Sequence, residues 1–234
     1  MNFFSHFFFD RHHQDSLFVV GISTPDLLSV FDRRVKLKEN KLLTRLEEEK
    51  IAPELERFMH GVLRHLEGDR IFHSSDFFTY ETHHLSGLLK QAFPDGEIKR
   101  GFFLAHIMLE LLLDKILIES DPRFLEEFYR HFHARELAYI KYLSEQIAQR
   151  PLLEYEAYLR RFVSSRFLFR YQNPDYIIYV LERIFRRVGI YEYRYLESVA
   201  FLDLMNLYEK ELRGRIPTII DTLNSQLIPL SKTG

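Results

Sequence analysis

The sequence predicts an all-α protein, a single-domain helical bundle with a metal site between its core helices. Apolar residues recur at helical spacing through most of the 234 residues. Only nine Gly and eight Pro punctuate the chain, too few for the many turns of a sheet. There is no convincing run of residues that alternates as a half-buried strand does. A chain of this length can bury one sizeable core.

The first half of the chain predicts a short starting element and three longer helices. Residues 1–10 predict a short helix or turn, and residues 11–50 predict irregular structure with a charged helical piece near LLTRLEEEK. A helix is expected over 53–72, with Pro53 in its first turn. Two more are expected over 80–92 and 98–118.

The second half predicts a succession of helices separated by proline-containing turns. Asp121 and Pro122 suit the N-cap and the first position of a helix, and Asn173-Pro174-Asp175 marks a later boundary. The expected helices cover 122–148, 151–171, 175–188, 192–213 and 217–227.

The length of the chain favours a single domain over residues 1–234. We expect the metal ligands in its first half, 1–120, and further helices in its second half, 121–234. The 32 basic and 34 acidic residues nearly balance, so the chain lacks the basic field expected of a nucleic-acid-binding protein. No cysteine is present, which excludes disulfides and cysteine zinc sites. Any metal must therefore be held by His and carboxylate groups.

Two apolar stretches indicate where in the cell the protein is expected. The opening MNFFSHFFFD lacks the charged region and the cleavage site of a signal peptide. The apolar stretch 102–118 carries three ionisable residues that would be costly in a bilayer. We therefore expect a cytoplasmic protein without membrane insertion.

Two ladders of potential metal ligands are the strongest functional signal. His65, Asp69 and His73 are spaced by four residues, and His106, Glu110 and Asp114 repeat that spacing. Four residues are one helical turn plus about 40°, so each ladder should project from one face of its helix. The ends of a ladder are about 12 Å apart, too far to share an ion. We expect Asp69 to bridge ions, with a His on either side.

Ordinary contacts between residues four apart on an exposed stripe are the alternative explanation. Apolar residues surround the second ladder on almost every other face, which disfavours exposure. His6 and Asp26 are weaker candidates, since an isolated His can be structural and Asp26 can be a cap or turn residue.

The second half is rich in arginine, which predicts a solvated face or, as the less favoured alternative, a surface for a phosphate or an acidic partner.

Three stretches together resemble a known family: MNFFSHFFFD, the segment from Gly61 to His73, and the segment from His106 to Asp114. They are similar to the acyl carrier protein phosphodiesterase family, of which the chain looks like a divergent member. Its Asn-Phe-Leu-Ala-His-like opening places a His at His6, and its Gly-Ile…His…Asp block matches His65 and Asp69. That block normally continues into Phe-Thr-Asp and a further His, whereas here Ile71, Phe72 and His73 follow.

The order of the ligands is also similar to that in zinc-dependent phospholipase C and the related single-strand nucleases. Those proteins are all-α and hold three zinc ions between helices, with an N-terminal Trp as one ligand. This chain contains no Trp. The residues that follow this order are His6, Asp26, His65, Asp69, His73, His106 and Glu110.

Both resemblances imply metal-dependent hydrolysis of a phosphodiester, with two or more divalent ions such as Mn, Zn or Fe. The seven residues just given are the expected ligands, and Asp69 and Asp114 are the expected catalytic carboxylates. The first resemblance implies removal of a 4′-phosphopantetheine-like group from an acyl carrier protein. The alternatives are a phosphoesterase for another substrate and a non-catalytic helical binding module that retains the site.

Overall fold

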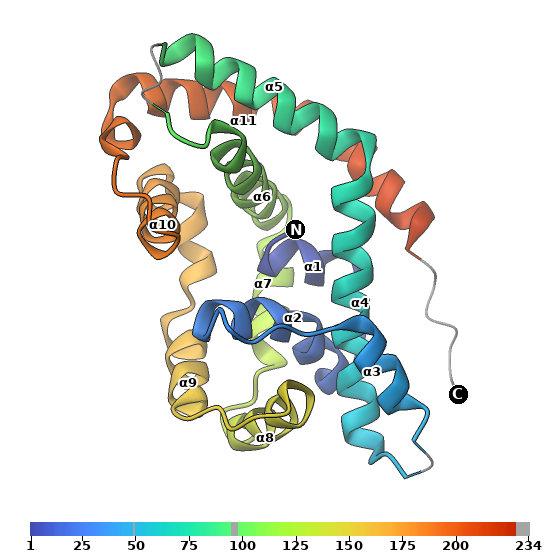
Figure 1. Ribbon diagram of the computed structural model, residues 1–234. Coiled ribbons are helices and arrows are strands. Elements are labelled where there is room, and N and C mark those ends of the chain that lie inside the picture. Colours follow the sequence, from blue (N-terminus) through green and yellow to red (C-terminus); the bar gives the residue numbers. More distant parts are fainter. Residues whose placement is uncertain (49, 95–97, 228–234) are drawn as a thin grey trace. The chain divides into compact units, whose positions relative to one another are not determined.

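The chain is all-α, as the sequence predicts. The computed structural model describes residues 1–48, 50–94 and 98–227, and in these ranges every regular element is a helix (Figure 1). None of these helices is both long and apolar enough to cross a membrane.

The α-helices are α1 (Phe3–Phe9), α2 (Ser16–Phe31), α3 (Glu39–Leu46), α4 (Pro53–Ser74), α5 (Asp76–Ala92), α6 (Gly101–Ser120), α7 (Pro122–Arg130), α8 (Leu137–Ala148), α9 (Tyr155–Ser165), α10 (Pro174–Arg187) and α11 (Val199–Gln226). Two short 3₁₀ helices, η1 (Phe167–Gln172) and η2 (Arg194–Glu197), flank α10.

The chain divides into two compact units, and each unit takes two separate stretches of sequence. The first contains Met1–Arg70 and Asp121–Phe169, and the second contains Ile71–Ser120 and the chain from Arg170 onward. The division falls within α4, so the two ends of this helix belong to different units. Each unit therefore draws on both of the halves, 1–120 and 121–234, that the sequence suggests.

Aromatic side chains build the core of the first unit. Phe4 and Phe7 of α1 are fully buried, and the ring of Phe128 on α7 lies 6.5 and 5.4 Å from theirs. Phe162 of α9 contacts Phe128 in turn, with 6.3 Å between ring centroids. Helix α1 also packs on α2. This packing places His6, in the middle of α1, in the protein interior.

In the second unit α6 packs against α5, α10 and α11, and α5 also packs against α11 (Figure 1). A buried polar group joins the last two helices. The carboxylate of Glu81 on α5 accepts hydrogen bonds from the guanidinium of Arg215 and, at 2.9 Å, from the hydroxyl of Tyr208, both on α11. Glu81 is completely buried, whereas the side chain of Arg215 is 32% exposed, so this ion pair joins the core to the surface.

The expectation of irregular structure over 11–50 is wrong for α2. Gly21 and Pro25 usually interrupt helices, which is why the segment does not look helical. The side chain of Asp15 nevertheless caps the helix by accepting from the N–H of Leu17 at 2.9 Å. Much of α2 is buried, including the consecutive residues 18–24, so it shows little amphipathic period.

Other boundaries also differ from expectation. The helix expected over 151–171 is divided into α9 and η1, and the one expected over 192–213 is divided into η2 and the first part of α11. Residues 131–136 separate α7 from α8, where the sequence predicts one continuous pattern. Helix α11 runs through Pro217, where the sequence predicts a break. Leu212, Ile216, Ile219 and Leu223 form a buried stripe on α11. Burial of this stripe offsets the hydrogen bond that proline removes from the helix.

Candidate metal centres

Six of the seven predicted ligands fall into two groups, one in each unit, and the seventh, Asp69, is in neither. The first group is His6, Asp26 and His65, and the second is His73, His106 and Glu110. Within each group one ligand atom of every residue lies within 4.8 Å of the others. The predicted ladder on α4 is therefore divided, because His65 joins the first group and His73 the second.

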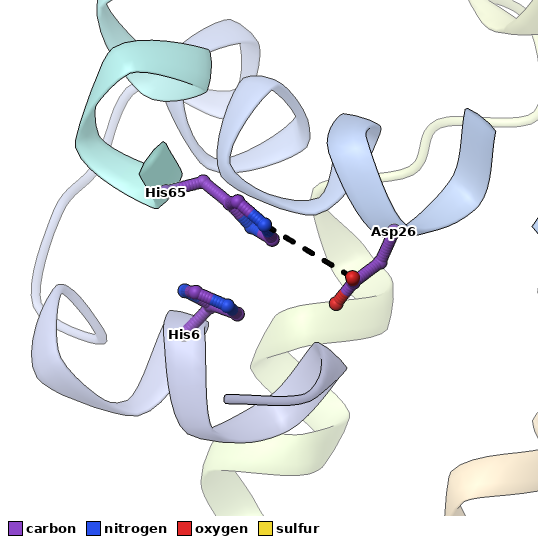
Figure 2. A group of neighbouring side chains, drawn as sticks. All are labelled: His6, Asp26 and His65. Carbon is purple, nitrogen blue, oxygen red and sulfur yellow. Dashed lines mark ion pairs between the residues drawn. The ribbon is translucent and has the colours of Figure 1, made fainter. Parts of the chain in front are cut away.

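Three helices supply the first group. Figure 2 shows His6 on α1, Asp26 on α2 and His65 on α4, with the carboxylate directed toward the two imidazoles. The rings of His6 and His65 are stacked, with 3.6 Å between their centroids. The Nε2 atom of His65 lies 4.0 Å from Oδ1 of Asp26. Both histidines are buried, at 4% and 3% exposure.

A pair of glycines brings α2 and α4 close enough to form this group. A Cβ atom on Gly61 would lie 2.0 Å from the carbonyl oxygen of Phe18, and one on Gly21 would lie 2.2 Å from that of Phe58. Only glycine permits such an approach of two backbones. Because the helices touch here, His65 on α4 can reach the backbone of α2.

The contact with the backbone of α2 fixes the orientation of the His65 ring. Its Nδ1 lies 2.8 Å from the carbonyl oxygen of Ile22, which can only accept a hydrogen bond. The proton is therefore on Nδ1, and the lone pair of Nε2 is directed into the group. Ligand histidines in metalloproteins are commonly held in this way. Burial lowers the pKa of His65 well below its usual value, and the nearby His6 acts in the same direction, so the ring is neutral.

Asp69 lies one turn beyond His65 on α4 and pairs with both histidines of the first group. Its carboxylate oxygens are 3.1 Å from Nε2 of His6 and 3.6 Å from Nε2 of His65. It also accepts from the amino group of Met1 at 2.8 Å. Burial raises the pKa of Asp69, but the charge and hydrogen bond of His6, together with the Met1 amino group, outweigh this and keep the pKa below its usual range.

The second group has the tighter geometry. The Nε2 atoms of His73 and His106 are 3.1 Å apart, and Oε1 of Glu110 lies 3.1 and 3.0 Å from them. An ion with bonds of about 2.0–2.2 Å separates neighbouring ligand atoms by about 2.8–3.6 Å. All three distances lie in that range, so the three atoms are spaced as ligands of one divalent ion would be. The 4.0 Å separation in the first group is wider.

The second group is partly open to solvent. The side chains of His73 and His106 are 32% and 29% exposed, and that of Glu110 is 12% exposed. The ring of Phe78, on α5, lies 4.8 and 4.9 Å from the two imidazoles and covers one side. Burial raises the pKa of Glu110, but its surroundings, including hydrogen bonds with both histidines, bring the pKa below its usual range.

Asp114, the last residue of the second ladder, belongs to neither group. It lies on α6 one turn beyond Glu110 and is completely buried. Eight residues of helix separate it from His106, a rise of about 12 Å, so it cannot share an ion with that residue. Its expected catalytic role stays a prediction, as does the bridging role expected of Asp69.

Sequence reasoning missed three features that position the ligands. The glycine pair sets the distance between α2 and α4, and Phe78 packs on the second group. The third feature is Arg64, which donates to Asp10 at 2.9 Å and so fixes the end of α1 against α4. The two glycines, which lie within helices and carry an energetic penalty there, are the signal that could have been read from the sequence.

No family model matches this chain, and no curated protein or solved structure shows significant similarity to it. The two resemblances given by the sequence therefore stay predictions.

Proposed function

We propose that the protein is a metal-dependent phosphodiester hydrolase and that His73, His106 and Glu110 hold the ion at its reaction site. The observation that carries this proposal is the convergence of three ligand atoms at 3.0–3.1 Å from one another. Two histidines and one carboxylate are a ligand set used by catalytic zinc and iron sites. The partial exposure of the group leaves room for water and substrate, which a purely structural site does not need.

In this proposal the chain positions the ligands and controls their protonation. When bound, a divalent ion lowers the pKa of water and neutralises charge on phosphoryl oxygens. His6, Asp26 and His65 form a further ligand group, which the Ile22 carbonyl and the glycine pair preorganise. Asp69 supplies a negative charge beside that group. Asp114, buried on the same helix one turn beyond Glu110, is the second proposed catalytic carboxylate.

The substrate proposal is a 4′-phosphopantetheine-like group on an acyl carrier protein, in the cytoplasm. It is supported by the resemblance at MNFFSHFFFD and from Gly61 to His73. The geometry of the ligand groups supports the reaction class, and a phosphoester of another kind would suit the same groups.

The reaction is tested with a generic aryl phosphodiester in the presence of Mn²⁺ or Zn²⁺. We expect turnover by the wild-type protein and a loss of at least about 100-fold in Glu110→Gln, which keeps the shape but not the charge of the ligand. Glu119→Gln is the matched control, because Glu119 lies on the same helix and pairs with Lys115 instead. Equal activity in the two variants would contradict the proposal.

The substrate is tested separately by incubating a holo-acyl carrier protein with the metal-loaded protein and measuring the mass of the carrier. Loss of the prosthetic group supports the substrate. An unchanged mass together with turnover of the aryl diester removes the carrier and keeps the reaction. Bound metal without turnover of either compound would favour the non-catalytic binding module.

A further inference from the structure

Positive charge is concentrated in one short segment of the first unit. Residues 33–45 contain six Lys and Arg residues and a single acidic residue, although the whole chain has a formal charge of −2. The segment connects α2 to α3 and includes most of α3. The buried side chains of Val35 and Leu42 anchor it to the unit. We call residues 33–45 the basic segment.

Three of its cations are not neutralised by the protein. Lys36, Lys38 and Lys41 are exposed, and none of them forms an ion pair with a residue that the structure describes. Two further cations, Arg34 and Arg45, are held in place. Arg34 forms a two-pronged pair with Asp32, and Arg45 donates to the backbone and side-chain oxygens of Gln146 on α8. The segment thus combines fixed guanidinium groups with free ammonium groups.

A cleft lies along one face of α3, beside two of these cations, Lys41 and Arg45. It has a volume of about 540 Å³, and its lining includes Lys41, Arg45 and Gln149. Lys41 and Arg45 are four residues apart, so they lie on the same face of the helix. Gln149, in a left-handed conformation (φ 52°) at the end of α8, also lines the cleft.

We propose that the basic segment and its cleft form a docking surface for an acidic polypeptide segment. Exposed unpaired lysines attract carboxylates and orient the encounter, so the partner is expected to carry a negative charge. The surface lies wholly within the first unit and does not depend on metal binding or on the proposed reaction.

One feature of the cleft favours a polypeptide over a nucleic acid. None of the residues that line it is aromatic, so it offers no ring on which bases could stack.

The test measures binding of a fluorescently labelled glutamate-rich peptide by anisotropy at low salt. We expect saturable binding that weakens strongly as salt is added, because screening shortens the reach of surface charges. The combined variant Lys36→Glu, Lys38→Glu, Lys41→Glu should bind at least about tenfold more weakly. The matched control is Arg135→Glu, Arg160→Glu, Arg161→Glu, which makes the same change in net charge at exposed positions of the same unit. It should bind within about twofold of the wild type.

Three results would overturn the proposal. They are no binding by the wild-type protein, an equal loss in both triple variants, and tighter binding of a poly-dT oligonucleotide or of phosphatidylserine vesicles than of the peptide. Circular dichroism and thermal melting of each variant show whether its fold is kept. If the lysine variant is misfolded, the single variant Lys38→Glu replaces it and should still weaken binding.

Discussion

The tautomer and the orientation of individual histidines in this protein depend on their immediate neighbours. His65 has its proton fixed on Nδ1 by the Ile22 carbonyl, and burial keeps the ring neutral. His73 and His106 instead direct Nε2 at the same carboxylate oxygen of Glu110. A backbone acceptor controls the tautomer in the first case, and a shared acidic partner controls the orientation in the second.

His131 allows a test of histidine protonation away from both ligand groups. Its Nδ1 lies 3.1 Å from the hydroxyl of Ser16, and burial together with the nearby His133 lowers its pKa. The unfolded chain therefore takes up a proton at a higher pH than the folded protein does. The contribution of His131 to the stability of the folded protein is complete when the pH is above about 6.5, the pKa of a histidine in the unfolded chain. This contribution is lost as the pH falls below that value.

We expect His131→Gln to lose less stability than the wild type between about pH 7 and pH 5. Denaturant unfolding midpoints at the two pH values measure the difference. His83→Gln is the control, since His83 is exposed and is not among the groups that shift the pKa of His131. The same loss of stability in His131→Gln and in the wild type would show that His131 does not resist protonation.

At the scale of elements, the crossing of α2 and α4 determines whether the first ligand group can form. Gly61→Ala would place a methyl group 2.0 Å from the carbonyl oxygen of Phe18. Neither backbone can move away without separating the helices, so we expect a loss of about 2–4 kcal/mol in the free energy of unfolding. Chemical denaturation measures this value.

Gly214→Ala is the matched control for that substitution. Gly214 also lies within a helix, but an added Cβ atom there meets nothing within 4 Å. Alanine should be neutral or stabilise the protein by about 0.5–1 kcal/mol. A Gly61 variant as stable as the Gly214 variant would mean that α2 and α4 are not in backbone contact.

The pair of α5 and α11 depends on the buried carboxylate of Glu81. Glu81→Ala leaves the guanidinium of Arg215 and the hydroxyl of Tyr208 without their acceptor. Arg215 is partly exposed and can recover some hydration, so we expect a loss of about 2–4 kcal/mol rather than the full cost of an isolated buried charge. Glu156→Ala, which removes an exposed pair with Arg160, should change stability by less than about 0.5 kcal/mol. Similar unfolding midpoints for the two variants would contradict a structural role for Glu81.

For the whole molecule, the fold class and several helix boundaries could be predicted from the sequence. Asp121-Pro122 and Asn173-Pro174 do begin α7 and α10, because side-chain caps and proline act locally. Helix α2 and the passage of α11 through Pro217 could not be predicted. In both helices burial by distant segments outweighs local residues that oppose a helix, and a local pattern does not contain that information.

The candidate site shows the same limit. Four-residue spacing correctly groups His106 with Glu110, since one helix carries both. It cannot show that His65 and His73, on one helix, belong to different groups, or that His6 stacks on His65. Those relations depend on how α1, α2, α5 and α6 pack. The division into two units falls within α4, and the amino-acid composition gives no sign of it.

Both ligand groups are proposed to hold divalent metal ions, and the amount of metal bound by the purified protein shows whether they do. Elemental analysis after reconstitution with Zn²⁺ or Mn²⁺ should find one ion for each of the two groups. His106→Ala should bind one ion fewer than the wild type. His84→Ala should bind the same number, because His84 has the same 29% side-chain exposure but pairs with Glu211 on α11. Absence of stoichiometric metal in the wild type, or equal metal content in His106→Ala, would contradict the claim.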